Sequence, residues 1–511
     1  MAGTRILGAL ALIANAPLIK AQPVVSILNG SYESLHLPAF QQDLFLGIPY
    51  AQDTGGANRF RIPQALEETW NGTRDAKIYG HACPDQNVPA DSVYGMSEDC
   101  LSINIVRPAG LDDDDVRLPA MLWINGGSYQ VGTSGLSNYN LTYLVEKSVE
   151  IGKPIVGASI NYRKGGWGNM YSVEIQGSGN TNLALRDMRK GLAWTQENIE
   201  NFGGLGQLLM SYGGRTDGLF HRSIQESGSA ATAWYNGTDW YQPIYDKIVG
   251  QVNCTAAADT LECLRTVEYD VLHPFLNTFV VAGPGFYPTV DGNIIPDYPT
   301  ELLHSGRFAH VPHLYGTNFD ESTDNAPVGV INTNEDLRNF LLHDTGFNFP
   351  NAARFADKGR QYVRHYAEHA LTYNYRFNTR PWENSTTTAT SSPTSNSSDT
   401  DPDPEDQLAP AYKGVEHFSE VAFVFNNPTT AGPWPQYEAL SAQMSSQWTH
   451  FAYGGDPNGE GLPDWPVYSS SASGWNLVLQ AEAQGGAYAE EDVYRLAGRE
   501  YLTRWARRRH V

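Results

Sequence analysis

Short apolar segments alternate with a long helical pattern in the middle of the chain, and this alternation constrains the fold more than any other feature. Residues 119–124 (PAMLWI) and 155–162 (IVGASINY) have the length and apolar character of buried strands. From residue 182 to 201, leucine and methionine recur on one side of a helix, and Gly203 suits its left-handed end. Apolar strands that alternate with helices predict an α/β fold, in which helices cover both faces of a mostly parallel sheet.

The N-terminal residues differ from the rest of the chain. Arg5 is followed by an apolar stretch at residues 6–16, and residues 19–21 (IKA) form an acceptable cleavage site. We therefore predict a signal peptide over residues 1–21, a secreted mature chain and no transmembrane segment. A buried first helix is the alternative reading of the same residues.

The chain has four cysteines, Cys83, Cys100, Cys254 and Cys263. Their even number and close spacing within two pairs suit local disulfides in an oxidising compartment. A zinc site is the alternative, which the lack of a Cys-x-x-Cys motif disfavours. No metal is therefore expected.

Glycosylation is a further expectation for a secreted chain, because seven Asn-x-Ser/Thr sequons are present. The sequons begin at Asn29, Asn71, Asn140, Asn236, Asn253, Asn384 and Asn396.

The charge distribution excludes one class of partner. The formal net charge is −22, and binding to nucleic acid needs clustered cations. The basic cluster at residues 504–509 is interpreted as a solvated end, and the four aspartates at 112–115 as a surface loop.

Residues 384–407 are rich in Ser, Thr, Pro, Asn and Asp, so they are expected to form a disordered loop insertion within one domain over residues 22–511.

Three segments contain candidate catalytic groups. Residues 123–129 (WINGGSY) run from a strand into a glycine turn whose N–H groups could approach a developing oxyanion, although most such turns are only structural. Glu321 follows the strand-like residues 311–315, and sites in open α/β sheets lie at strand C-termini. His417, within KGVEHFSE, is the candidate base.

From about residue 24 onward the chain resembles the type-B carboxylesterase/lipase family, which includes the cholinesterases and many secreted fungal esterases. The resemblance is specific because six separate motifs carry it. These are FLGIPYA at 45–51, SEDCLSIN at 97–104, SINYR at 159–163, NLALRD at 182–187, WTQENI at 194–199 and ESGS at 226–229.

The resemblance implies an α/β-hydrolase fold and serine-type acyl transfer on a small-molecule or lipid carboxylic ester, with no cofactor. It implies that Glu321 is the acid and His417 the base of a catalytic triad. It also implies oxyanion N–H groups at Gly127 and Ser128, where Ser128 replaces a glycine that the family usually has. Trp234 is implied as an acyl-pocket wall.

The resemblance also implies structural pairings. It pairs Cys83 with Cys100 and Cys254 with Cys263 in disulfides. It further suggests two ion pairs, which join Arg163 to Asp187 and Arg59 to Glu98.

One part of the family pattern is absent. No serine in the chain has glycine two residues before and two residues after it, so the Gly-x-Ser-x-Gly nucleophile elbow is missing. Residues 202–204 (FGG) run directly into 205–210 (LGQLLM), which matches the later part of the helix behind the elbow. Compared with the family pattern, about 18 residues are lacking, namely a strand, the elbow and the start of a helix. The chain is therefore expected to be inactive as written.

Three explanations remain open for the missing elbow. An intron could be assigned wrongly in the gene, the chain could be a splice form or decaying pseudoenzyme, or another serine could replace the nucleophile. Ser227 is the favoured substitute, ahead of Ser229 and Ser128, although its simpler role is a hydrogen-bonding neighbour of the acid–base pair. A non-catalytic cholinesterase-like binding protein is the alternative function, and the oligomeric state is not predicted.

Overall fold

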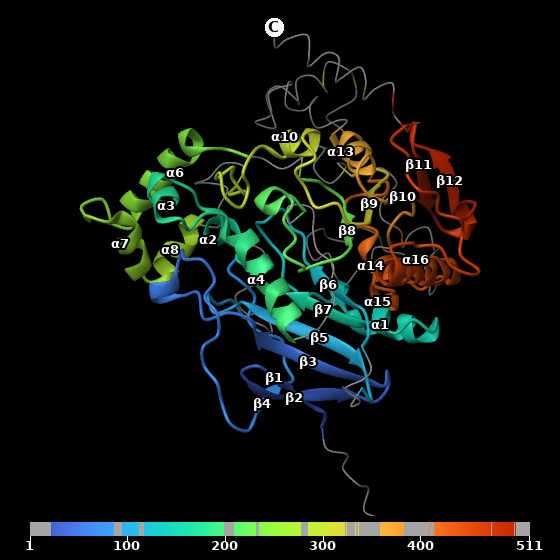
Figure 1. Cartoon of the computed structure of the whole chain (residues 1–511), viewed down its shortest axis with the longest axis horizontal. Coiled ribbons are helices and arrows are strands. Elements are labelled where there is room, and N and C mark those ends of the chain that lie inside the picture. The colour runs from blue at the N-terminus through green and yellow to red at the C-terminus, as the bar shows by residue number, and fades with distance from the viewer. Residues whose placement is uncertain are drawn as a thin grey trace, which may run out of the picture.

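Two β-sheets and the helices beside them form the part of the chain that the structure describes (Figure 1). The structure is a computed structural model. It describes residues 22–85, 95–111, 117–198, 209–230, 235–276, 285–321, 323, 333, 336, 358–382, 408, 413–471, 473–494 and 496.

The first sheet has seven strands in the order β1-β2-β3-β5-β7-β6, with β4 paired to β2. Its N-terminal strands pair mainly antiparallel, whereas β6 and β7 are parallel. The strands are β1 (Val24–Ile27), β2 (Gly30–Leu37), β3 (Gln42–Pro49), β4 (Thr73–Ala76), β5 (Ser102–Pro108), β6 (Ala120–Ile124) and β7 (Val156–Ile160).

The second sheet has five strands in the order β12-β11-β10-β9-β8. The ladders from β8 to β11 are parallel, and β12 adds an antiparallel edge. The strands are β8 (Ser223–Glu226), β9 (His313–Asn318), β10 (Thr372–Phe377), β11 (Trp475–Leu479) and β12 (Tyr488–Glu491).

The strands and helix predicted in the middle of the chain are present. Residues 119–124 contain β6, residues 155–162 contain β7, and α4 (Leu183–Asn198) begins where the helical pattern begins. The apolar residues on one side of α4 are buried as predicted. The predicted end of this helix, at residues 201–203, lies outside the described residues.

The expected single sheet is divided in two. Within the described ranges, β6 ends one sheet and β8 ends the other, and neither has a second strand partner. The site of the missing elbow, between residues 204 and 205, falls in the undescribed range 199–208. The loss of a strand there therefore stays a prediction.

Helices pack beside the central strands and connect many of the strands from β6 onward (Figure 1). Within the described ranges, every helix is too short or too polar to cross a bilayer. The helices besides α4 are η1 (Gly56–Asn58), η2 (Ser137–Tyr139), α1 (Leu141–Glu150), α2 (Gly165–Asn169), α3 (Val173–Ser178), η3 (Ser211–Gly213), α6 (Thr238–Gln251), α7 (Thr260–Thr266), α8 (Tyr269–Leu276), α10 (Pro299–His304), α13 (Lys358–Ala367), α14 (Val421–Val424), α15 (Pro428–Ala431), α16 (Pro435–Gly454) and η7 (Glu482–Gln484).

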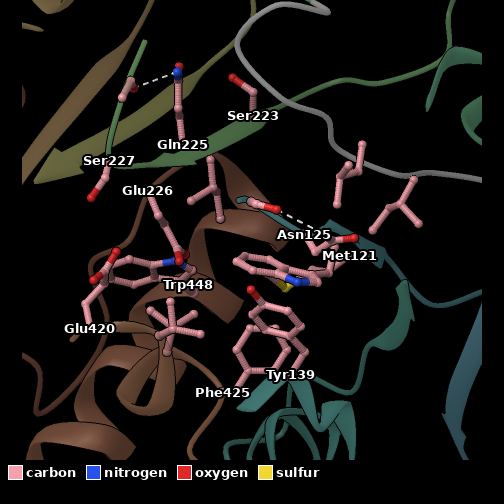
Figure 2. Close-up of a pocket in the computed structure, with 18 of the residues that line it drawn as sticks. Met121, Asn125, Tyr139, Ser223, Gln225, Glu226, Ser227, Glu420, Phe425 and Trp448 are labelled. Atoms are coloured by element: carbon pink, nitrogen blue, oxygen red, sulfur yellow. Dashed lines mark hydrogen bonds between the residues drawn. The ribbon is translucent and has the colours of Figure 1, made fainter. Parts of the chain in front are cut away.

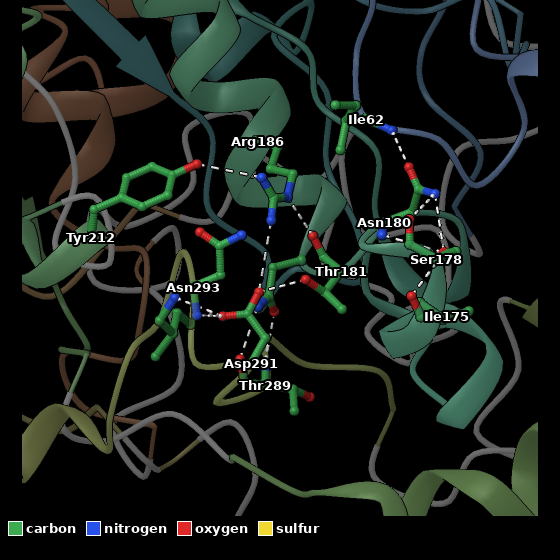
Figure 3. A network of polar contacts seen from close by, with 12 residues as sticks. Ile62, Ile175, Ser178, Asn180, Thr181, Arg186, Tyr212, Thr289, Asp291 and Asn293 are labelled. Carbon is green, nitrogen blue, oxygen red and sulfur yellow. Dashed lines mark hydrogen bonds and ion pairs between the residues drawn. The ribbon is translucent and has the colours of Figure 1, made fainter.

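A polar network fixes the start of α4 (Figure 3). The Asn182 side chain forms two hydrogen bonds with the backbone of Thr289, at 2.7 and 2.8 Å. Asp291 accepts a hydrogen bond from Thr181 Oγ1 at 2.5 Å and lies 3.9 Å from the Arg186 guanidinium. These contacts tie the N-terminal end of the helix to a segment more than 100 residues away in sequence.

The pairings that the family resemblance implied are present. Disulfides join Cys83 to Cys100 and Cys254 to Cys263. Both expected ion pairs form, and each has a shortest N–O distance of 2.6 Å. The Arg163–Asp187 pair is almost fully buried and joins the segment after β7 to α4.

Other sequence predictions fall outside the described residues. They are the signal peptide at residues 1–21, the aspartate run at 112–115, the insertion at 384–407 and the basic cluster at 504–509.

Breaking the buried ion pair tests its structural role. Arg163→Met leaves the carboxylate of Asp187 buried without its cation, so we expect the free energy of unfolding to fall by about 3–5 kcal/mol. Arg307→Met is the matched control, because its partner Asp297 is exposed, and it should leave the unfolding midpoint unchanged. Denaturant unfolding followed by tryptophan fluorescence measures both, and an equal loss in the two variants would contradict the argument.

Candidate active site

A carboxylate and an imidazole that lie 96 positions apart in the sequence contact one another. His417 Nδ1 lies 2.6 Å from Glu321 Oε2. Glu321 is three residues beyond the end of β9, and His417 lies in the turn before α14. The imidazole side chain is 54% exposed, so it is open to solvent and to small molecules.

The second carboxylate oxygen of Glu321 holds two more groups. Glu321 Oε1 accepts hydrogen bonds from Ser227 Oγ at 2.5 Å and from the backbone N–H of Asn318 at 2.7 Å. Ser227 directly follows β8 and has a φ of 55°. The carboxylate therefore joins the ends of β8 and β9 to the imidazole.

The Ser227 contact bears on its two predicted roles. A serine nucleophile must give its proton to the imidazole nitrogen that the acid does not hold. The Ser227 hydroxyl instead donates to the acid. This geometry suits a positioning role and leaves Ser227 poorly placed for attack.

The glycine turn after β6 has an unusual backbone. Gly127, Ser128 and Tyr129 have φ values of 102°, 55° and 62°. A Cβ atom on Gly127 would lie 2.2 Å from the carbonyl oxygen of Val131, so this position requires glycine. Among the described residues, the N–H groups of Gly127 and Ser128 have no hydrogen-bond acceptor, and both residues line the cavity described next.

A cavity of about 440 Å³ connects these parts. Its walls include all of β6 and β8, the glycine turn, Ser227, Ser229 and His417. Aromatic and aliphatic side chains from α1, α14 and α16 are also among the lining residues. The structure thus brings five sequence-predicted residues, Gly127, Ser128, Ser227, Ser229 and His417, to one cavity, with Glu321 behind the imidazole. Trp234 lies outside the described residues.

Two buried carboxyl groups in this wall were not singled out from the sequence. Burial, together with the charge of Glu420, raises the pKa of Glu226 to about 8. Burial, together with the charge of Glu321, raises the pKa of Glu420 to about 7. Figure 2 shows both beside the Trp448 indole, whose N–H donates to Glu226 Oε1 at 2.8 Å.

A local signal could have identified these two residues. Glu226 directly precedes Ser227, and Glu420 lies three positions after His417. Both therefore stand inside motifs already linked to the site. Their burial, which makes them unusual, is not visible in the sequence.

The described residues contain no group of three or more His, Cys, Asp or Glu side chains that could hold a metal ion. The four cysteines are all in disulfides.

Comparisons with known proteins agree on the family. A model of the carboxylesterase family matches residues 21–346 and 341–494. Lipase 1 of Geotrichum candidum is 34% identical over 61% of this chain, and the match spans 65% of that lipase, slightly under two thirds of its length. An inactive carboxylesterase-like protein, VdtD of Byssochlamys spectabilis, is 31% identical over 81% of this chain and 80% of its own. Secreted lipase 1 of Botryotinia fuckeliana is 32% identical, over 61% of this chain and 60% of that lipase.

A solved structure is similar over almost the whole chain. The crystal structure of Aspergillus niger EstA matches with a TM-score of 0.76 and 24% identity, over 94% of this chain and 98% of EstA. At this level of identity the likeness shows the fold alone. The predicted α/β-hydrolase fold is therefore confirmed.

Substitution of Gly127 tests the constraint on the turn. Gly127→Ala forces a Cβ onto a positive-φ residue and against the carbonyl of Val131, so we expect a loss of about 1–3 kcal/mol in the free energy of unfolding. Gly126→Ala is the matched control, because a Cβ there meets nothing within 4 Å. Thermal unfolding of the two variants gives the comparison, and equal stabilities would contradict the geometry.

The buried carboxyl of Glu226 predicts a pH-dependent stability. Between pH 4.5 and about 8 the folded chain keeps a proton on Glu226 that the unfolded chain releases, so this group lowers the free energy of unfolding as pH rises through that window. Glu226→Gln removes the titration and keeps the acceptor for Trp448. We expect the variant to be more stable than the unmodified chain at pH 8.5, on the order of a few kcal/mol, with little difference at pH 4.5.

Urea unfolding at the two pH values measures this difference. Glu438→Gln is the control, because that carboxylate is exposed, and it should shift the midpoint equally little at both pH values. A gain in Glu226→Gln that is independent of pH would contradict the explanation.

Proposed function

Because this chain belongs to the carboxylesterase family, we propose that Glu321 and His417 are the acid and base of a site for hydrolysing carboxylic esters, and that the 511-residue chain does not complete the reaction. The observation that carries the proposal is the 2.6 Å contact between His417 Nδ1 and Glu321 Oε2 beside the cavity, in a chain without a Gly-x-Ser-x-Gly serine. A small-molecule or lipid ester is the substrate class of the site.

The residues present have distinct parts in this chemistry. Glu321 would hold the imidazole through Nδ1–H and stabilise the imidazolium, which leaves Nε2 to accept the proton of a nucleophile. The N–H groups of Gly127 and Ser128 would stabilise the oxyanion. Such acyl transfer needs no cofactor, since the acyl group passes to the serine and then to water.

The missing part is the oxygen that carries the acyl group. Loss of the nucleophile from a triad lowers turnover on the order of a million-fold. Ser227 does not replace it in our proposal, because its hydroxyl donates to Glu321 rather than to the imidazole.

A second candidate function is a non-catalytic binding protein on the same scaffold. The similarity to VdtD, which is named as an inactive carboxylesterase-like protein, supports it. Retention of both Glu321 and His417 supports descent from an active esterase. Secretion of the chain rests on the predicted signal peptide and on the two disulfides.

Hydrolysis of p-nitrophenyl butyrate by the purified 511-residue chain tests the proposal. We expect a rate no higher than that of His417→Ala, and no change after treatment with a fluorophosphonate, because no serine is activated. Phosphonate-sensitive turnover would contradict the proposal. Mass spectrometry of the adduct, compared with Ser227→Ala, would then show whether Ser227 is the nucleophile.

Sequencing the transcript distinguishes a wrongly assigned intron from a true loss of the nucleophile elbow. Sequenced cDNA across codons 204 and 205 either joins them directly or contains extra codons. Extra codons with a Gly-x-Ser-x-Gly motif would show that a longer product carries the esterase activity, and its expression should restore phosphonate-sensitive hydrolysis.

A further inference from the structure

The edge of β6 that faces away from β7 carries peptide groups without a strand partner. Val156 N donates to Pro119 O at 2.9 Å, so residue 119 points toward β7. In a parallel ladder, alternate residues direct their N–H and C=O groups to opposite sides. Ala120, Leu122 and Ile124 therefore direct theirs away from β7.

The same reasoning applies to β8. The N–H groups of Ser223 and Ser227 donate to the carbonyl oxygens of Pro312, which precedes β9, and of Gly316, within β9, at 3.0 and 2.9 Å. Ile224 and Glu226 consequently direct their peptide groups away from β9. Within the described ranges this edge also has no strand partner.

The two edges line one cavity. All residues of β6 and of β8 lie in the wall of the 440 Å³ space, and Figure 1 shows the two strands near each other in the middle of the molecule. A strand edge with unpaired N–H and C=O groups is a template for another strand. Here two such edges border the same cavity.

Side chains in the wall show what kind of ligand fits. Met121, Leu144 and Phe425 make the wall apolar. A hydrocarbon chain would leave both strand edges unsatisfied, whereas a peptide backbone offers donors and acceptors along its whole length.

From this arrangement we infer that the cavity accepts one extended apolar peptide strand from another polypeptide, which pairs with β6 on one side and with β8 on the other. This is recognition by strand addition, in which the main chain provides affinity and the side-chain pockets provide selectivity. The length of β6 sets the size of the strand, since five residues match its five. The inference does not depend on the ester chemistry proposed above.

A capped pentapeptide, acetyl-Val-Thr-Val-Ala-Val-amide, tests the inference on the purified full chain. The matched control is the same peptide with its three central peptide nitrogens methylated, which keeps the side chains and removes donors. We expect one peptide to bind per chain by titration calorimetry, at least about tenfold tighter than the methylated control. Equal affinities, or no binding at about 1 mM peptide, would overturn the inference.

Hydrogen exchange shows where the peptide binds. The amides of Ala120, Leu122, Ile124, Ile224 and Glu226, which point into the cavity, should exchange at least about tenfold more slowly with peptide present, because paired amides exchange only on opening. The outer strands β1 and β12 are internal comparisons and should not change. Protection of β1 or β12 instead would place the peptide at an ordinary sheet edge and overturn the inference.

A variant of the acceptor edge adds a third measurement. Ile224→Pro removes an N–H that points into the cavity and leaves the β8–β9 ladder its own donors, a position at which strands tolerate proline. We expect peptide binding to weaken at least about tenfold. Unchanged affinity in the folded variant would contradict pairing with β8.

Discussion

Three hydrogen bonds converge on the carboxylate of Glu321, and the arrangement of the site depends on them. They come from the imidazole of His417, the hydroxyl of Ser227 and the backbone of Asn318. Hydrogen bonds to an ionised carboxylate are shorter and stronger than neutral ones. One side chain therefore holds together the ends of two neighbouring strands and the turn before α14.

The surroundings of the Glu321 carboxylate disfavour further negative charge on the side chains of the cavity wall. Glu226 and Glu420 lie in the same wall, and burial disfavours their ionised forms. The charge on Glu321 adds to this effect at Glu420. Burial thus favours the protonated forms of Glu226 and Glu420 and reduces the negative charge in the cavity wall.

The division of the sheet into two also determines where the cavity of the site lies. The cavity lies where β6 and β8 present their free edges, and the glycine turn, Ser227 and His417 open onto it. The contacts of Glu321 with Asn318 and His417 run through β9 and the turn at His417 rather than across the space between the sheets. A chain without a nucleophile elbow can therefore still bring Glu321 and His417 into contact.

By itself, the sequence determined the local structure and the identity of the parts. The apolar runs at 119–124 and 155–162 and the helical pattern from residue 182 predicted β6, β7 and α4, because short-range apolar periodicity reflects burial directly. The motifs around Glu321 and His417 singled out two residues that the structure brings into contact, and the lack of a Gly-x-Ser-x-Gly serine is a fact of the sequence alone. Only the tertiary structure decided that Ser227 bonds the acid, that Glu226 and Glu420 are buried together, and that two strand edges share one cavity. Those features depend on contacts between segments far apart in the chain and on the burial of side chains away from solvent. No local sequence pattern predicts either.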